Sequence, residues 1–425
     1  MMNKINCYTY KRMTLRIVSP TTVADSRVLS PQEYIYDNHS RMLYVLNDTQ
    51  WFCYLQKKGL LRDFENKCVQ SELIEIPLYE WLEENLHRRG FDVESELGTA
   101  VKYKIPAESK PTIKNKETGK KSLNKINLCM RLCDGRVYIP GSTIKGVIRT
   151  AILFYSLSKK GNLRKIYYRS LKKAIDENRQ KETEEIRKIE LEGLAKREKE
   201  LLQWKLKKCL ERDLESKLKN LIRKTESELL QRLQVKGEEI NNVLRDAMRG
   251  IRCSDAMPQG TISTRVVQKI DFKLKEGAYN TLPIYKEMIE PGATFSFTIT
   301  LEPSMTKTIG IERVEDIIEC LQYWFDKVTG TLSEYFQDTY LDLFKEYYKA
   351  NCMIGGNTNF LYKVIFLAFT DDEEEGEAMP LVKRVLDRFY GKHLTDNIIS
   401  PRTLKGTSMN GTFYMTGEAK IQIEE

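Results

Sequence analysis

Alternating apolar and polar residues predict strands at both ends of the chain. Residues 10–18 alternate until Ser19-Pro20 stops the run, and residues 418–423 have the pattern of a closing strand. The short runs 34–36 and 42–46 surround a turn, which predicts a hairpin near the N-terminus. We therefore expect the two ends of the chain to contribute β-structure.

The middle of the chain has a helical pattern instead. The segment 158–249 contains almost no Pro or Gly, and its leucines form an apolar stripe. The leucine spacings vary among three, four and seven residues, which favours packing on the body or an antiparallel helical hairpin over a coiled coil. Further helices are expected at 51–61, 73–89 and 311–348, the last as a pair, and further strands at 262–270 and 295–301.

A turn that leads into a helix is the most informative stretch. Pro140-Gly141 ends a strand-like run, Ser142 or Thr143 can cap the following helix, and apolar residues then recur at helical spacing. Lys145 and Arg149 lie one turn apart near the positive end of the helix dipole, an arrangement that suits a phosphate. An ordinary amphipathic helix with two solvated cations is the alternative interpretation.

A second stretch combines glycines with polar residues before an apolar run. Gly355, Gly356 and Asn357 can expose several backbone N–H groups to a phosphate, and Lys363 follows. The same residues can also form an ordinary turn. The lysine-rich residues 110–125 read as a loop that either lines an RNA path or is simply solvated.

Composition narrows the class of protein. The 425 residues are 41% hydrophobic and 10% aromatic, which predicts a folded chain, and no signal peptide or membrane-spanning run is seen, so we expect a cytoplasmic protein without a membrane partner. The formal charge is +9, and residues 159–249 hold 26 Lys and Arg against 17 Asp and Glu, whereas the remainder is balanced. Such a local basic excess favours a polyanionic partner.

Catalytic and metal-binding patterns are missing from the sequence. The three histidines His39, His87 and His393 are dispersed, the nine cysteines are scattered without a zinc-like spacing, and no phosphate-binding P-loop occurs. We expect neither a metal nor a cofactor.

The residues around the first stretch resemble a known family. The order Ile-Pro-Gly-Ser-Thr-Ile-Lys-Gly-Val-Ile-Arg-Thr is similar to the Pro-Gly-Ser-Ser-Ile-Lys-Gly-x-Arg-type segment of the RAMP superfamily, the RNA-binding subunits of CRISPR effector complexes. The Gly355-Gly356 loop, the Cys-Ser-Asp-Ala segment at Asp255 and residues 401–405 resemble the same family. The N-terminal pattern resembles the subunit that caps the 3′ end of the guide RNA in type III-A complexes, although residues 22–26 replace its Gly-rich loop.

This resemblance implies an α+β fold with two ferredoxin-like, RRM-related units, residues 1–157 and 250–425, separated by the charged helical insertion 158–249. It implies a non-catalytic subunit that binds the 3′ region of crRNA, caps the backbone filament and aids crRNA maturation by recruiting host exoribonucleases in antiviral defence. The implied partners are neighbouring RAMP backbone subunits, the small subunit and target RNA at the end of the complex.

The expected RNA contacts follow from the stretches above and the basic residues near them. They are Pro140, Gly141, Ser142, Thr143, Lys145, Arg149, Arg252, Arg265, Gly355, Gly356, Asn357, Lys363, Arg402 and Lys405. Two alternatives stay open: an endoribonuclease of the same superfamily that processes precursor crRNA, for which His39 would be the candidate base, and a helical scaffold without RNA affinity. Asp25 maps loosely onto the loop Asp with which the sister backbone subunit cleaves target RNA, and we assign it no catalytic role.

Overall fold

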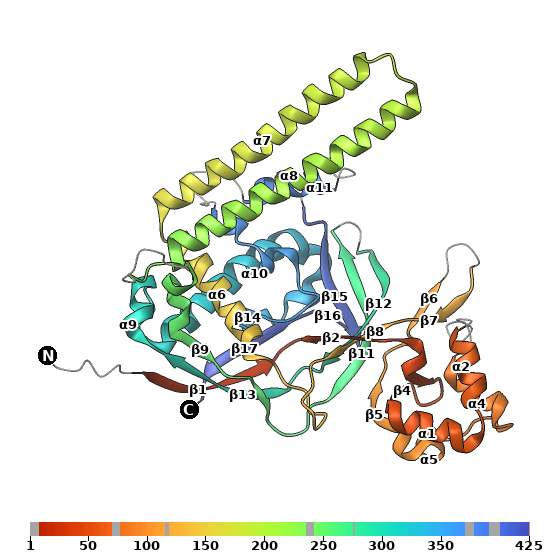
Figure 1. The fold of residues 1–425 in the computed structure, drawn as a ribbon. Helices are drawn as coiled ribbons and strands as arrows, with labels where there is room; N and C mark the ends of the chain where they lie inside the picture. Colours follow the sequence, from red (N-terminus) through yellow and green to blue (C-terminus); the bar gives the residue numbers. More distant parts are fainter. Residues whose placement is uncertain are drawn as a thin grey trace.

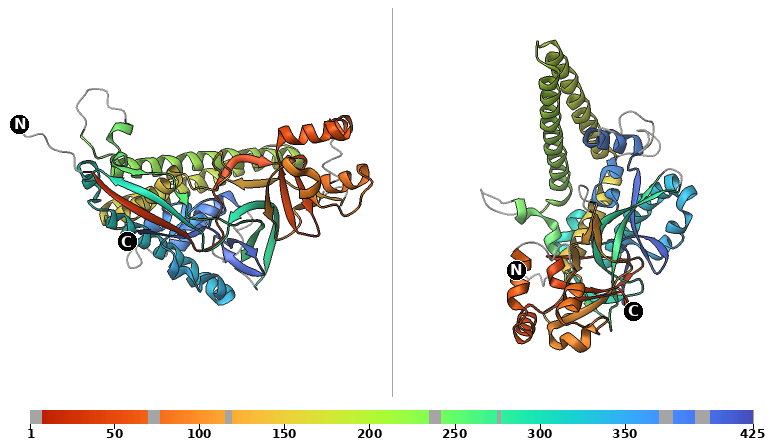
Figure 2. Two further views of the ribbon diagram at one scale, coloured as in Figure 1. Left: turned by 90° about the horizontal axis from the view of Figure 1, so that it is seen from below. Right: turned by 90° about the vertical axis from the view of Figure 1, so that its right-hand side faces the viewer.

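The computed structural model describes residues 8–69, 77–114, 119–234, 242–274, 277–369, 378–390 and 400–424. Within these ranges the chain has a mixed α+β fold, in which two large sheets and two long helices form the body (Figure 1). A pair of long helices projects from the body, and a small lobe lies at its other end (Figure 2). No helix in the described ranges is both long and apolar enough to cross a membrane.

The first large sheet, which we call sheet A, has the order β10-β13-β1-β17-β14, with β9 also paired to β13. Its strand β1 pairs antiparallel with β13 on one side and β17 on the other, so the first strand and the last strand are neighbours. Met13, Leu15 and Ile17 lie on the buried face, as the alternation predicted. The strands are β1 (Thr9–Ile17), β9 (Ile251–Cys253), β10 (Met257–Pro258), β13 (Thr294–Leu301), β14 (Cys352–Met353) and β17 (Glu418–Ile423).

The second large sheet, sheet B, has the order β16-β15-β11-β12-β8-β2. β8 and β12 run parallel, and the other neighbours are antiparallel. Both sheets combine strands from before and after residues 158–249. The sequence pattern did not predict β12, because Pro283 and several exposed polar residues interrupt its alternation. The strands are β2 (Ala24–Leu29), β8 (Ile126–Cys129), β11 (Thr264–Lys273), β12 (Tyr279–Ile289), β15 (Thr403–Met409) and β16 (Thr412–Met415).

The small lobe contains the predicted N-terminal hairpin. The strands β3 (Tyr34–Asp37), β4 (Met42–Leu46) and β5 (Val101–Pro106) form its sheet, and α1 (Asp48–Lys58), α2 (Leu61–Val69), α4 (Leu78–Asn85) and α5 (Val93–Leu97) surround a separate apolar core. The expected loop at 110–125 is partly wrong, because its described ends pair as β6 (Thr112–Lys114) and β7 (Lys121–Leu123).

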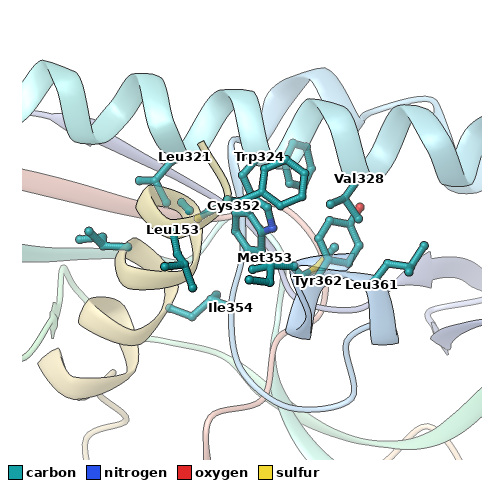
Figure 3. Packing of buried hydrophobic residues seen from close by; sticks show 14 of the residues in the cluster. Leu153, Leu321, Trp324, Val328, Cys352, Met353, Ile354, Leu361 and Tyr362 are labelled. Atoms are coloured by element: carbon teal, nitrogen blue, oxygen red, sulfur yellow. The ribbon is translucent and has the colours of Figure 1, made fainter. Parts of the chain in front are cut away.

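Two helices cover the buried face of sheet A. α6 (Gly141–Ser158) packs against α10 (Val314–Phe344), and both contribute to one apolar core with the inner residues of the sheet. Trp324 and Tyr362 pack edge to face in this core, where the Tyr362 hydroxyl bonds to Thr329 at 2.6 Å (Figure 3). The expected pair of helices at 311–348 corresponds to α10, in which two helical segments meet at a kink where Tyr340 has a non-helical backbone.

The predicted helical segment forms an antiparallel hairpin of α7 (Gly161–Leu191) and α8 (Lys196–Leu230) (Figure 1). Leu171 and Leu214 near its base belong to the core of the body, whereas Leu191 and Trp204 at its far end are exposed. The base also contacts α11 (Ala378–Phe389), where Arg388 donates to the side chain of the buried Asn178 at 2.9 Å. The base of the hairpin is therefore part of the body, and the far end is not.

A buried carboxyl group begins the closing strand. Glu418 is 5% exposed, and its Oε1 has no hydrogen-bond partner. Burial raises the pKa of Glu418 to about 8, although a hydrogen bond with Ser19 opposes the shift. Between about pH 4.5 and pH 8, the folded chain therefore keeps a proton on Glu418 that the unfolded chain has already released.

We predict that Glu418→Gln changes how stability depends on pH. The folded-state pKa is raised, so the wild-type free energy of unfolding falls as the pH rises from about 4.5 to about 8. The variant removes this fall, which amounts to a few kcal/mol, on the order of 1.4 kcal/mol per pKa unit. Urea denaturation at several pH values measures it, with Glu424→Gln at an exposed position just after the same strand as control. Parallel curves for wild type and Glu418→Gln would contradict the prediction.

Candidate nucleic-acid interface

The start of α6 is capped by a distant carboxylate. Pro140 is the N-cap residue, and the Gly141 N–H donates to Asp255 Oδ1 at 2.7 Å. The expectation that Ser142 or Thr143 caps this helix is wrong, because the helix begins earlier and no side chain of the N-cap residue bonds to it. Asp255, in the Cys-Ser-Asp-Ala segment, instead supplies the negative charge that the helix N-terminus favours.

Gly141 allows two backbone segments to touch. A Cβ on this residue would lie 2.4 Å from the carbonyl oxygen of Cys253. Any side chain would therefore push α6 away from β9, which follows the helical hairpin in the chain. The glycine of the Pro-Gly pair serves packing within the protein.

The two cations predicted at the start of α6 have different surroundings. Arg149 is held by Asp246 at 2.7 Å and by Glu226 at 3.7 Å, so its charge is largely satisfied within the chain. Lys145 is partly buried and has no ion-pair partner among the described residues, and this desolvation lowers its pKa. Arg252 lies near Lys145, and its side chain is 62% exposed with Glu302 at 3.7 Å.

The second glycine stretch also packs against the protein itself. Gly355 has φ +85°, and a Cβ there would lie 2.2 Å from the Thr22 carbonyl oxygen. Gly356 donates its N–H to the same oxygen at 2.8 Å, but a Cβ on Gly356 would meet nothing closer than 3.7 Å. Asn357 also has positive φ, and its side chain donates to Thr416. Gly355 is thus required by the fold, whereas Gly356 leaves open space beside Lys286.

Lys286 lies beside this glycine loop, Lys269 and Lys363 lie near Lys286, and Lys405 lies near Lys269. We call these four residues the lysine cluster. Asp271 accepts from Lys405 at 2.8 Å and lies 3.9 Å from Lys269. In the described part of the chain, no ion pair holds Lys286 or Lys363. Burial lowers the pKa of Lys269, Lys286 and Lys363, and the neighbouring lysines lower the pKa of Lys269 and Lys286 further. Lys269, Lys286 and Lys405 are half-buried and Lys363 is exposed, so the cluster is a partly desolvated positive site that an anion would stabilise.

Residues 19–23 connect the two sites. The Thr22 carbonyl meets the glycine loop, and the Val23 carbonyl accepts from the Met130 N–H at 2.8 Å. Met130 in turn accepts from Tyr138, two residues before Pro140. The two stretches that the sequence singled out, far apart in the chain, are therefore built on one short segment.

Other predicted contacts are used differently. Arg265 is held by Glu290 at 2.9 Å and Glu108 at 3.9 Å. Arg402 lies beside Lys405 along an apolar groove of about 660 Å³ between α8 and the body. His39 belongs to the turn after Asp37, His393 lies outside the described residues, and no group of three or more metal-ligating side chains occurs within them.

Sequence reasoning missed Lys286 and the role of Asp255 as a cap. Both belong to the site only through strand pairing and long-range contacts, for which the local pattern carries no signal. Lys269 was visible only as one of several basic residues near the start of the second half.

Comparison with known proteins places these features in a family. A sequence model of the RAMP superfamily matches residues 14–360. A relative from Enterococcus italicus described as "CRISPR system Cms protein Csm5" is 20% identical over 97% of both chains. The protein of the same description from Mycobacterium tuberculosis is 23% identical over 82% of this chain and 80% of its own.

Solved structures show the same fold. A chain in a Csm-crRNA-target RNA ternary complex of a type III-A CRISPR-Cas system aligns with a TM-score of 0.60, 16% identity, and coverage of 97% of this chain and 100% of that chain. Csm5 of T. onnurineus aligns with a TM-score of 0.51 and 14% identity over 96% and 99% of the two chains.

We predict that Gly355→Ala and Gly356→Ala differ sharply. Alanine at 355 is strained by its positive φ and by the Thr22 carbonyl, so the free energy of unfolding should fall by at least about 2 kcal/mol. Alanine at 356 meets only ordinary contacts and should change stability by less than about 1 kcal/mol. Thermal and urea unfolding measure the change in the free energy of unfolding for each of the two variants. Equal losses at the two positions would show that Gly355 is not the residue that the close approach requires.

Proposed function

Because the chain belongs to the RAMP superfamily, we propose that it is a crRNA-binding subunit of a type III-A CRISPR effector ribonucleoprotein. The family expected from the Pro-Gly and Gly-Gly stretches is confirmed. Relatives that span most of this chain carry the description Csm5, and a structural neighbour is part of a complex with crRNA and target RNA. These likenesses support the assignment to this class of subunit.

We propose further that the subunit binds the 3′ region of the crRNA, caps the backbone filament and assists 3′ maturation by recruiting exoribonucleases. Its partners would be the neighbouring RAMP subunits, the small subunit and target RNA at the end of the complex. In this proposal the chain has no catalytic residue of its own. The two ferredoxin-like units, residues 1–157 and 250–425, also stay a proposal, with each large sheet taking strands from both.

Two positive sites support the RNA-binding role: Lys145 and the lysine cluster, which residues 19–23 connect. Lys145 on α6 and Lys286 beside the glycine loop are partly buried, Lys363 is exposed, and none of the three has a carboxylate partner in the described residues. Phosphate groups would neutralise these charges without competition from the chain itself. Arg149 would position Lys145 through α6, and Asp271 would orient Lys405.

The first test is the salt dependence of RNA binding. Lys286→Gln with Lys363→Gln, and separately Lys145→Gln, should weaken binding of repeat-derived RNA and reduce the slope of log affinity against log salt by about 0.7 to 0.9 per lost contact. Stability should not fall, because Lys145 and Lys286 are partly buried charges without a partner and Lys363 is an exposed one. Fluorescence anisotropy at several salt concentrations measures the slopes.

Lys172→Gln, at an exposed position on α7, is the matched control. Unchanged slopes in folded cluster variants would refute the assignment of these lysines. Discrete cuts in the RNA without added metal, absent with the variants, would favour the endoribonuclease instead.

The second test concerns the helical hairpin. We propose that its far end contacts a protein partner and is not part of the RNA site, because Leu191, Leu201 and Trp204 are 88%, 51% and 59% exposed there. Replacing residues 184–204 by a short Gly/Ser linker keeps the packed base, including the contact of Asn178 with Arg388.

We predict that the shortened protein stays folded and binds RNA to within roughly tenfold, about 1.4 kcal/mol, of wild type. It should join the effector complex or its nuclease poorly. A pull-down and an RNA titration on one preparation measure both properties. Normal assembly with lost RNA binding would contradict the docking role.

A further inference from the structure

Sheet A has a second face that no helix or strand of the described residues covers. Its inner face packs on α6 and α10, and both helices lie on the same side of β1, β13 and β17 (Figure 1). The outward residues of β1 are Tyr10, Arg12, Thr14 and Arg16, and Tyr10, Arg12 and Arg16 are exposed. The outward face is therefore an open surface in the described part of the chain.

The register places particular side chains together on this open face. Arg12 is opposite Thr298, Tyr10 is opposite Thr300, and Thr300 is in turn opposite Arg252. Tyr8, just before β1, has the Arg252 guanidinium 5.6 Å from its ring centre. Tyr8 and Tyr10 are 47% and 58% exposed. The face thus combines two accessible aromatic rings, two arginines and a row of hydroxyl groups.

One pair of cations on the face lies close together. Arg16 lies directly opposite Lys420 across β1 and β17, and both side chains are exposed. Like charges opposite one another in an antiparallel pair destabilise a sheet. Within the described residues no ion pair holds Arg12, Arg16 or Lys420, so nothing in the chain neutralises this pair. An anionic ligand would remove the repulsion.

The composition of the face distinguishes among anionic partners. Stable protein interfaces have an apolar centre, but apart from the tyrosines the one large apolar side chain exposed on this sheet, among the residues described, is Met257. Separated cations with accessible aromatic rings are instead the features that bind single-stranded nucleic acid, since the cations contact phosphates and the rings stack on bases. Threonine and serine hydroxyls add donors for phosphate or sugar oxygens.

We propose that the open face of sheet A is a second RNA-binding surface, which holds a single-stranded segment through Arg12, Arg16, Arg252 and Lys420 and stacks bases on Tyr8 and Tyr10. The proposal rests on the RNA-binding role argued above, but it uses none of the lysines of that site. Binding on this face is independent of base sequence, because the contacts are to phosphates and ring faces.

The test compares three proteins with one unstructured oligouridine RNA. Arg12→Gln/Arg16→Gln/Lys420→Gln alters the open face, and Arg169→Gln/Lys172→Gln/Lys181→Gln removes the same charge from exposed positions on α7. The open-face variant should reduce the salt slope by about 2, from roughly 0.7 for each of three phosphates, whereas the α7 variant should leave it close to wild type. Ultraviolet crosslinking followed by mass spectrometry should place uridine on the peptide that contains Tyr8 and Tyr10 in the wild type.

A second pair of variants isolates the stacking. Tyr10→Phe keeps the ring and should bind as wild type does, and Tyr10→Ser should lose about fivefold or more in affinity. A folded open-face variant with an unchanged slope, and no crosslink on that peptide, would overturn this inference. If the Lys286→Gln/Lys363→Gln protein still loses RNA affinity in that case, the proposed function holds and only the open-face proposal fails. Failure of the wild type to bind any RNA would overturn both.

Discussion

The backbone hydrogen bonds of residues 18–23 hold both sheets and both glycine stretches in one arrangement. The first two N–H groups of this segment donate to the Glu418 carbonyl in sheet A, and Thr21 exchanges two bonds with Ile289 in sheet B. The next two carbonyls accept from Gly356 and Met130. These bonds come from four separate parts of the chain, so a shift of the segment by one residue would leave several buried polar groups without partners. The positive sites exist only while this segment is in register.

Glycines make that register possible by removing Cβ atoms at close contacts. Gly355 approaches the Thr22 carbonyl, Gly141 approaches Cys253, and Gly417 approaches the Ile354 carbonyl. The residues that resemble the family's phosphate-binding stretches therefore act first on the protein's own backbone. In the proposed function their contribution to RNA binding would be indirect, because they hold the backbone segments that carry or adjoin the unpaired lysines. The glycines would fix the backbone, and the lysines would contact the phosphates.

Local patterns predicted those elements whose signal lies within a few residues. β1, β17, the first hairpin and α6 all follow from periodicity and turn residues, and the long helices of the hairpin follow from composition. The pattern could not predict β12 or the cap from Asp255, since each depends on a partner far away in the chain. The same limit applies to the site. Lys145 was recognised from its place on a helix, whereas Lys286 belongs to the lysine cluster only because β12 pairs with β11.

Net charge along the sequence was a poor guide to the positive sites, and the reason is physical. The hairpin holds the basic excess, but many of its cations are exposed and lie within four residues of a carboxylate, as Lys188 does with Glu185 and Lys219 with Glu215. Such pairs neutralise each other locally and are screened by salt. Lys286 contributes little to the total charge, yet it is partly buried without an ion-pair partner among the described residues, and Lys363 near it is exposed and also has no such partner. Burial of an unpaired charge costs free energy that a bound phosphate would offset, so in the proposed function Lys286 would favour an anion more than the paired cations of the hairpin do.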